Sequence, residues 1–275
     1  CKMAIKPMTE NTIVITGATS GIGLATAIGL VKQGAYVIGV GRSILRCKEA
    51  ESIIKDAAPD GRISFLLTDL SSQKQIRELA DKIKRKVREE RNGTIDTLIN
   101  NAGTFSSWFS STEDGFELQF AVNHLAPFLL THQLLPLLMA APTGRIITVS
   151  SGSHYRTKIN WKDLQLRRHY NCLMAYKQSK LANVLFILEL NRRLGRDSTL
   201  RAFAADPGLV NTEMGLKGTM GIAKWVWQRR RKKGLRPEEG AATSIYLATE
   251  PLVQEAKDIY WKNRSEEHTS ELQSH

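Results

Sequence analysis

The stretch Asn11–Leu30, NTIVITGATSGIGLATAIGL, decides the fold of this chain. Its β-branched run Thr12–Thr16 predicts a buried strand. Three glycines, Gly17, Gly21 and Gly23, follow that strand and precede an Ala-rich apolar segment with helical spacing. A strand that passes through a glycine turn into a helix leaves backbone N–H donors free at the positive end of the helix dipole. The stretch therefore predicts a site for a pyrophosphate group.

Each glycine in this turn is expected to serve a different purpose. Gly17 permits the tight turn, Gly21 removes the Cβ that would block the phosphates, and Gly23 lets the helix pack close to the sheet. The alternative is a glycine-rich turn that binds nothing, which the context of a strand and a helix disfavours.

The rest of the chain alternates strands and helices without a break in composition. This pattern predicts one α/β domain over residues 1–263, with a doubly wound parallel sheet of about seven strands and helices on both faces. The expected strands are 12–16, 35–40, 63–67, 95–99, 145–149, 200–204 and 259–260. The expected helices follow the glycine turn and then cover 45–57, 73–91, 112–139, 175–194 and 237–249.

Composition narrows the classes of partner. The chain has 275 residues, 42% of them hydrophobic and 24% charged, and a net charge of +12. Its basic residues gather at 81–88, where apolar positions recur with helical spacing, and at 229–233. We interpret the first cluster as a solvated helix face, and because no nucleic-acid motif accompanies either cluster we expect no nucleic-acid partner.

The cysteines and histidines predict no metal site. Cys1, Cys47 and Cys172 are widely separated, and the six histidines have no paired-ligand spacing. Three unpaired cysteines fit a reducing compartment, and no run of 18 apolar residues is present, so a cytoplasmic location is expected.

Both ends of the sequence carry expectations of their own. A chain that begins at Cys1 is expected to be a fragment of a longer protein. Residues 264–275, RSEEHTSELQSH, back-translate into sequencing-adapter DNA and have no apolar period, so we interpret them as a non-native tail.

The residues after the second expected strand indicate which nicotinamide cofactor the chain prefers. Where a dinucleotide fold contacts the adenosine ribose, this chain has Gly41 and Arg42 instead of an acidic residue. A guanidinium suits a 2′-phosphate, which favours NADP(H) over NAD(H), although Arg42 could also begin a helix in solvent. Asp69 closes the third strand, where it could accept from an adenine amino group or cap the next helix.

Two further segments approach the same edge of the sheet. Asn100–Gly103, NNAG, follows the fourth strand and could tie neighbouring strands together, or form an ordinary turn. Within the expected helix 112–139, Pro127 cannot donate to the carbonyl of Asn123. That free carbonyl is a plausible water site, and a tolerated helix kink is the simpler interpretation.

Ser151, Tyr176 and Lys180 are the residue types that hydride transfer between a carbonyl and an alcohol requires. Tyr176 and Lys180 lie four residues apart on one helix face, so the ammonium is expected to lower the pKa of the phenol. Ser151 can hydrogen-bond the substrate oxygen while Tyr176 donates or removes the proton. The Tyr–x–x–x–Lys spacing alone is common, and its weight comes from the other motifs.

Taken together, these motifs resemble the short-chain dehydrogenase/reductase superfamily. The resemblance covers residues 10–262 and rests on five motifs: Thr16–Gly23 (TGATSGIG), Asn100–Gly103 (NNAG), Ser151, Tyr176-x-x-x-Lys180, and Pro207-Gly208. The segments 122–125, 128–131 and 179–186 are similar to the retinol dehydrogenase and WW-domain oxidoreductase-like branch.

The resemblance implies a Rossmann fold and a catalytic tetrad of Asn123, Ser151, Tyr176 and Lys180, with a relay water on the Asn123 carbonyl. It favours Ser151 over Ser150. It further implies a set of cofactor-binding residues: Gly17, Thr19, Ser20, Gly21, Ile22, Gly23, Arg42, Asp69, Leu70, Asn101, Ala102, Gly103, Tyr176, Lys180, Pro207, Gly208, Val210 and Thr212. Two positions depart from the branch, since Gly41 replaces a bulkier residue and Asp206 stands where His is frequent.

These observations predict an NADP(H)-dependent oxidoreductase for an apolar aldehyde, ketone or alcohol. Residues 212–236 occupy the position of a substrate lid, in which Trp225 and Trp227 could line the pocket or contact a membrane surface. The resemblance also suggests a homodimer. The alternatives are a cofactor-binding regulatory or scaffold protein without turnover, which the intact Ser–Tyr–Lys set disfavours, and an epimerase or dehydratase of the extended branch, which the glycine spacing disfavours.

Overall fold

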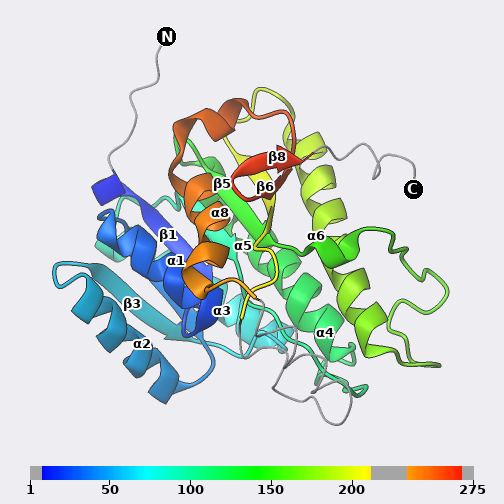
Figure 1. Ribbon diagram of the computed structural model, residues 1–275. Helices are drawn as coiled ribbons and strands as arrows, with labels where there is room; N and C mark the ends of the chain where they lie inside the picture. Colours follow the sequence, from blue (N-terminus) through cyan, green and yellow to red (C-terminus); the bar gives the residue numbers. More distant parts are fainter. Residues whose placement is uncertain (1–7, 212–233, 268–275) are drawn as a thin grey trace.

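An eight-stranded sheet forms the centre of the computed structural model, which describes residues 8–211 and 234–267. Its strand order is β3-β2-β1-β4-β5-β6-β7-β8 (Figure 1). The strands are β1 (Thr12–Thr16), β2 (Tyr36–Gly41), β3 (Arg62–Leu67), β4 (Thr97–Asn100), β5 (Arg145–Val149), β6 (Arg201–Asp206), β7 (Tyr260–Lys262) and β8 (Ser265–Glu267). The first seven pair in parallel, which confirms the predicted doubly wound α/β fold.

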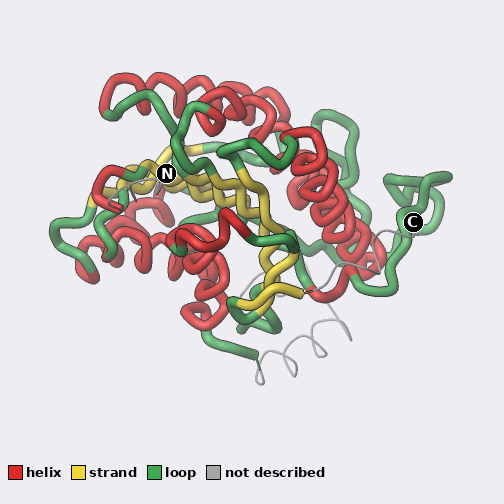
Figure 2. Tube along the Cα trace, turned by 90° about the horizontal axis from the view of Figure 1, so that it is seen from above, coloured by secondary structure: helices red, strands yellow, loops and turns green. Residues whose placement is uncertain are grey.

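Helices cover both faces of the sheet, as the view from above makes clear (Figure 2). The α-helices are α1 (Gly21–Lys32), α2 (Ile44–Ala57), α3 (Gln73–Glu90), α4 (Leu118–Phe120), α5 (Ala126–Met139), α6 (Cys172–Leu194) and α8 (Pro237–Thr249). Short 3₁₀ turns occur at η1 (Met8–Glu10), η3 (Gly152–His154) and η4 (Pro251–Glu255), and η2 (Ala121–Leu125) is a π-helical turn.

Two apolar clusters hold these layers together. One packs α3, α5 and α6 against the sheet through residues such as Leu79, Leu134 and Val184. The other packs α1 and α8 on the opposite face through Leu30 and Leu247. Since both faces are covered, the inner strands are continuous apolar runs without alternation, and every residue of β1 is buried.

β1 and β4 are neighbours at the middle of the sheet, and the direction in which successive strands are added reverses between them. Ligands of open α/β sheets bind outside the carboxyl ends of the strands at such a switch point. The glycine turn after β1 and the NNAG segment after β4 both lie at this edge. The topology therefore brings together the motifs that the sequence places far apart.

The predicted helix 112–139 is wrong at its beginning. The first helical residue is Leu118, because Gly115 adopts φ +81° and closes a turn in which the Thr112 amide donates to the Phe116 carbonyl. The helix that follows contains the π-helical turn η2 before Pro127, which the sequence does not predict.

The last strand, β8, also differs from the all-parallel prediction. It pairs antiparallel with β7 and lies inside the segment interpreted as a non-native tail, an interpretation that stays a prediction. Asn263 and Arg264 adopt φ +51° and +63°, the left-handed values that a two-residue turn of type I′ requires. Within the described residues, no helix combines the length and the hydropathy needed to cross a membrane.

Candidate active site

The glycine turn after β1 has the backbone conformation that only glycine adopts readily. Gly17 and Gly21 have φ +68° and +55°, and the amide of Gly17 donates to the Val40 carbonyl at 2.9 Å. A Cβ on Gly23 would lie 2.2 Å from the carbonyl oxygen of Gly17. Any side chain at position 23 would therefore push α1 away from the turn.

The N-terminus of α1 is open, unlike those of α2 and α3. Ser43 and Ser72 cap α2 and α3 through their side chains, whereas Ser20, the N-cap of α1, makes no side-chain cap hydrogen bond. The first N–H groups of a helix have no partner within it, so those of α1 are left for an anion. This cradle fits the pyrophosphate of a nicotinamide dinucleotide.

Ile22, in the same turn, faces Gly240 of α8.

The residues after β4 are fastened to the end of β1. The Asn101 side chain donates to the Thr16 carbonyl at 2.9 Å, and the Asn101 and Ala102 amides both donate to the Thr16 hydroxyl. Ala102 also lies against Gly17, where a Cβ would approach the Ala102 Cα to 2.9 Å. Half-buried Gly103 follows at the same edge, so NNAG ties neighbouring strands together.

The ends of β2 and β3 bring Arg42 and Asp69 together. Their side chains are 3.9 Å apart, and Asp69 also accepts from the amide and hydroxyl of Ser71. The cap of α3 is Ser72, so the capping role considered for Asp69 is wrong. A Cβ on Gly41 would lie 2.6 Å from the Thr19 methyl and 2.6 Å from the Cys47 sulfur, which explains why glycine occupies this position.

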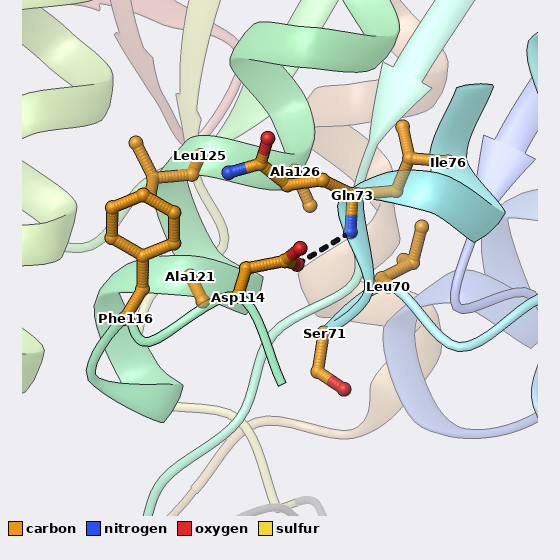
Figure 3. Close-up of a pocket in the computed structure, with 9 residues that line it drawn as sticks. All are labelled: Leu70, Ser71, Gln73, Ile76, Asp114, Phe116, Ala121, Leu125 and Ala126. Atoms are coloured by element: carbon orange, nitrogen blue, oxygen red, sulfur yellow. Dashed lines mark hydrogen bonds between the residues drawn. The ribbon is translucent and has the colours of Figure 1, made fainter. Parts of the chain in front are cut away.

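Leu70 lines a small pocket at the N-terminus of α3 (Figure 3). In this pocket the Asp114 carboxylate, from the loop before α4, accepts from the backbone amide of Gln73 at 2.8 Å. Glu113 accepts from the Ser72 hydroxyl beside it. This acidic loop therefore stabilises the start of α3, and its carboxylates satisfy structural donors.

The two serines after β5 have different environments. Ser150 is buried, and its hydroxyl donates to the backbone carbonyl of Lys180 in α6 at 3.1 Å. The Ser150 hydroxyl is therefore engaged with the backbone. Ser151 is half-buried; its hydroxyl accepts from the Ser153 amide at 3.2 Å, and its interaction with the Tyr176 phenol lowers the pKa of that phenol. The arrangement therefore directs Ser151, rather than Ser150, toward the tyrosine.

Tyr176 and Lys180 lie one turn apart on α6, and the Lys180 Nζ is 5.7 Å from the centre of the Tyr176 ring. Burial raises the pKa of Tyr176 to about 12, the Ser151 hydrogen bond opposes this shift, and the charge of Asp206 adds to it. Burial lowers the pKa of Lys180 to about 8, against the opposing charge of Asp206. The expected lowering of the phenol pKa is thus absent here, because desolvation dominates and Lys180 donates to the Val149 carbonyl at 2.9 Å.

Asn123 is fully buried in the π-helical turn η2. Its side chain exchanges hydrogen bonds with the Thr104 backbone and donates to the Ser179 hydroxyl at 3.1 Å. Its carbonyl accepts from the Asn183 side chain at 2.8 Å, and Asn183 in turn contacts the His124 ring at 3.1 Å. The Asn123 carbonyl was expected to be free because Pro127 has no N–H. It has a donor in the Asn183 side chain.

The segment after β6 completes the site. Gly208, after Pro207, adopts φ +73°, and its amide donates to the Asp206 carboxylate at 2.9 Å. Val210 bridges to Leu235. Thr212 and most of the lid predicted at 212–236 lie outside the described residues.

Sequence reasoning missed the role of Asn183 and of the carboxylate at Asp206. Asn183 belongs to a quoted motif, but only the fold places its amide on the Asn123 carbonyl. Asp206 was noted as a departure from the branch, and the signal was a carboxylate directly after the apolar run 202–205.

The sheet order and the open glycine turn define an α/β fold of the dinucleotide-binding class. The family described as short chain dehydrogenase matches residues 11–219, and the chain belongs to this family. It is 38% identical to retinol dehydrogenase 14 of Mus musculus, over 94% of this chain and 80% of that protein. It is 37% identical to polyprenol dehydrogenase of Homo sapiens, with coverages of 94% and 79%.

Solved structures agree with this assignment. A protein from Mycobacterium paratuberculosis has 36% identity and a TM-score of 0.69, covering 88% of this chain and 78% of that one. A metagenomic short-chain oxidoreductase in complex with NADP has 24% identity and a TM-score of 0.67, covering 94% and 98%, and shows the shared fold. The chain is therefore an oxidoreductase in the retinol dehydrogenase-like branch of its family, with a fold that binds a nicotinamide cofactor.

Proposed function

We propose that this protein reduces an apolar aldehyde or ketone to the alcohol, and oxidises the alcohol in reverse, with NADP(H) as the preferred cofactor. The observation that carries the proposal is the group of Ser151, Tyr176 and Lys180 at the edge of the sheet where the open N-terminus of α1 also lies.

Each member of this group has a distinct role in the reduction. The bound cofactor supplies the hydride that adds to the carbonyl carbon. Ser151 donates a hydrogen bond to the carbonyl oxygen, and Tyr176 transfers its proton to that oxygen as negative charge develops. With a pKa raised by burial to about 12, the phenol carries its proton at neutral pH, as the reduction requires. Lys180 supplies positive charge beside the phenol, and Asn123 holds the turn that packs against α6.

An apolar substrate is supported by the side chains around the site. The Phe105 ring lies 5.9 Å from the Tyr176 ring. Leu209 and Leu235, on either side of Gly208, are exposed by 45% and 38%. The relatives named above are named for retinol and polyprenol, which are both apolar alcohols.

Preference for NADP(H) is supported by Arg42 at the end of β2. Its guanidinium is exposed and carries the charge and the paired donors that suit a 2′-phosphate. Membrane contact through the lid and homodimer formation remain predictions.

The test is the transfer of a labelled hydride. The protein is incubated with NADPH deuterated at C4, in each of the two epimers, and with a panel of apolar aldehydes and ketones. We expect one deuterium at the carbinol carbon of at least one product, from one epimer only, detected by mass spectrometry. Tight NADPH binding without transfer to any carbonyl would contradict the proposal and support the binding-protein alternative.

A further inference from the structure

We propose that Asp206 is a positioning residue for the reaction: a buried carboxylate at the end of β6 that holds the turn at Gly208 and lies beside the end of β5, to whose Val149 carbonyl Lys180 donates. The inference rests on the proposed function. It adds to that function a negative charge, on Asp206, that acts on Tyr176 and Lys180. Asp206 ends β6 with 2% of its surface exposed.

Both oxygens of this carboxylate are fixed by donors. One accepts from the Gly208 amide at 2.9 Å, and the other accepts from the Tyr260 hydroxyl at 2.9 Å. Tyr260 is itself buried in β7. Because the backbone and a neighbouring strand hold the group from two sides, its charge has a fixed direction relative to α6.

The surroundings place Asp206 next to the segment that carries Ser151. A Cβ on Gly152 would lie 3.1 Å from the Asp206 carboxylate. The ring of His154, in the same turn, lies 4.8 Å from the Tyr260 ring at a tilt of 56°, and its Nδ1 contacts the Ser151 carbonyl at 2.7 Å. Lys262 is paired with Asp206 in the strand register.

The charge of Asp206 acts on three titratable groups in the same direction. It raises the pKa of Tyr176, of Lys180 and of His154, in each case by favouring the protonated form. For Lys180 and His154 this opposes the larger effect of burial, which lowers the pKa. A carboxylate at this position therefore keeps the ammonium charged and the phenol protonated, which is the state that donates a proton to a carbonyl oxygen.

The experiment measures Lys180 directly. The 275-residue protein is labelled with [ε-¹³C]lysine and titrated by NMR, and the Lys180 signal is assigned by its loss in Lys180→Met. Asp206→Asn preserves the shape of the side chain and removes its charge. We expect the Lys180 midpoint to move from about 8 to lower pH by about half a unit or more. Tyr260→Phe, which removes one donor but keeps the charge and the Gly208 donor, should move the midpoint less than Asp206→Asn does.

A pH profile of kcat/KM for carbonyl reduction provides the second readout. In Asp206→Asn the alkaline limb should move to lower pH, because Lys180, whose pKa is about 8 in the presence of the carboxylate, loses its proton more readily. A purely structural role would lower kcat at every pH and leave the limb in place. If Asp206→Asn does not fold, as judged by its thermal transition, Asp206→Ser replaces it as a smaller uncharged variant.

A folded, uncharged variant with an unchanged Lys180 midpoint and an unchanged alkaline limb would overturn the inference. The two readouts also separate it from the proposed function. A shifted midpoint in a protein without turnover would keep the role of the charge and refute the oxidoreductase, whereas a static midpoint with normal turnover would refute only the role of Asp206.

Discussion

The Arg42 side chain, which follows β2, is 78% exposed, and its guanidinium forms an ion pair with Asp69 at 3.9 Å. An exposed pair at this distance contributes little to stability, because solvent screens both charges. A bound 2′-phosphate would offer the same guanidinium two charge-assisted hydrogen bonds. The value of Arg42 is therefore expected to appear in cofactor binding rather than in folding.

Arg42→Ala should raise the Kd for NADPH by about 10- to 100-fold, which corresponds to the loss of one hydrogen-bonded charge pair. The Kd for NADH should change little. Both constants can be measured by quenching of protein fluorescence.

Lys48→Ala is the matched control for this change, since it removes an equal charge from the exposed face of α2. It should affect neither constant strongly. Equal losses of affinity for NADPH and NADH in Arg42→Ala would contradict the 2′-phosphate assignment.

At the scale of an element, the π-helical turn η2 depends on α6 for its shape. Pro127 has no N–H, so the normal helical bond to the Asn123 carbonyl cannot form. The Asn183 side chain supplies that donor from α6 and contacts His124 with its oxygen. Through this pair of hydrogen bonds, the helix that carries Tyr176 also fixes the position of Asn123.

Asn183→Ala should therefore lower both stability and turnover. The free energy of unfolding should fall by about 1–3 kcal/mol, since a buried carbonyl loses its donor. The kcat for carbonyl reduction should fall as well, while NADPH affinity changes little. Denaturant unfolding and steady-state kinetics measure the two effects.

Asn191 offers a control on the same helix. Its side chain exchanges two hydrogen bonds with the Ala202 backbone at the start of β6, away from the site. Asn191→Ala should lose a similar amount of stability and keep its kcat. Equal losses of kcat in the two variants would show that Asn183 acts only through stability.

The elements that could be predicted are those with strong apolar runs. The predicted bounds of Thr12–Thr16, Arg145–Val149 and Pro237–Thr249 agree with the structure. The start of the helix before Pro127 could not be predicted, because the turn at Gly115 and the hydrogen bonds of Glu113 and Asp114 to the start of α3 depend on how the fold brings these segments together.

The electrostatics of the site could be predicted less well than its residues. Spacing alone places Lys180 beside Tyr176 and suggests a lowered phenol pKa. The burial of Lys180 and of the Asp206 carboxylate depends on β6 and α6 meeting at one edge of the sheet. Desolvation of the phenol therefore reverses the direction that local spacing suggests.

At the scale of the whole molecule, the strand order joins two functions at one edge. The glycine turn after β1 offers the anion site, and β5 and α6 bring the serine, tyrosine and lysine to the neighbouring strand ends. We propose that a dinucleotide bound at the switch point would extend from one group to the other. The central claim is that the Tyr176 phenol transfers the proton at this edge.

The most direct measurement compares wild type with Tyr176→Phe in NADPH binding and in carbonyl reduction. The variant keeps the ring and removes only the hydroxyl. We predict an unchanged Kd for NADPH and a turnover lower by about 10²- to 10⁴-fold, the usual contribution of a general acid. Reduction by Tyr176→Phe at the wild-type rate, with NADPH bound as tightly, would contradict the account.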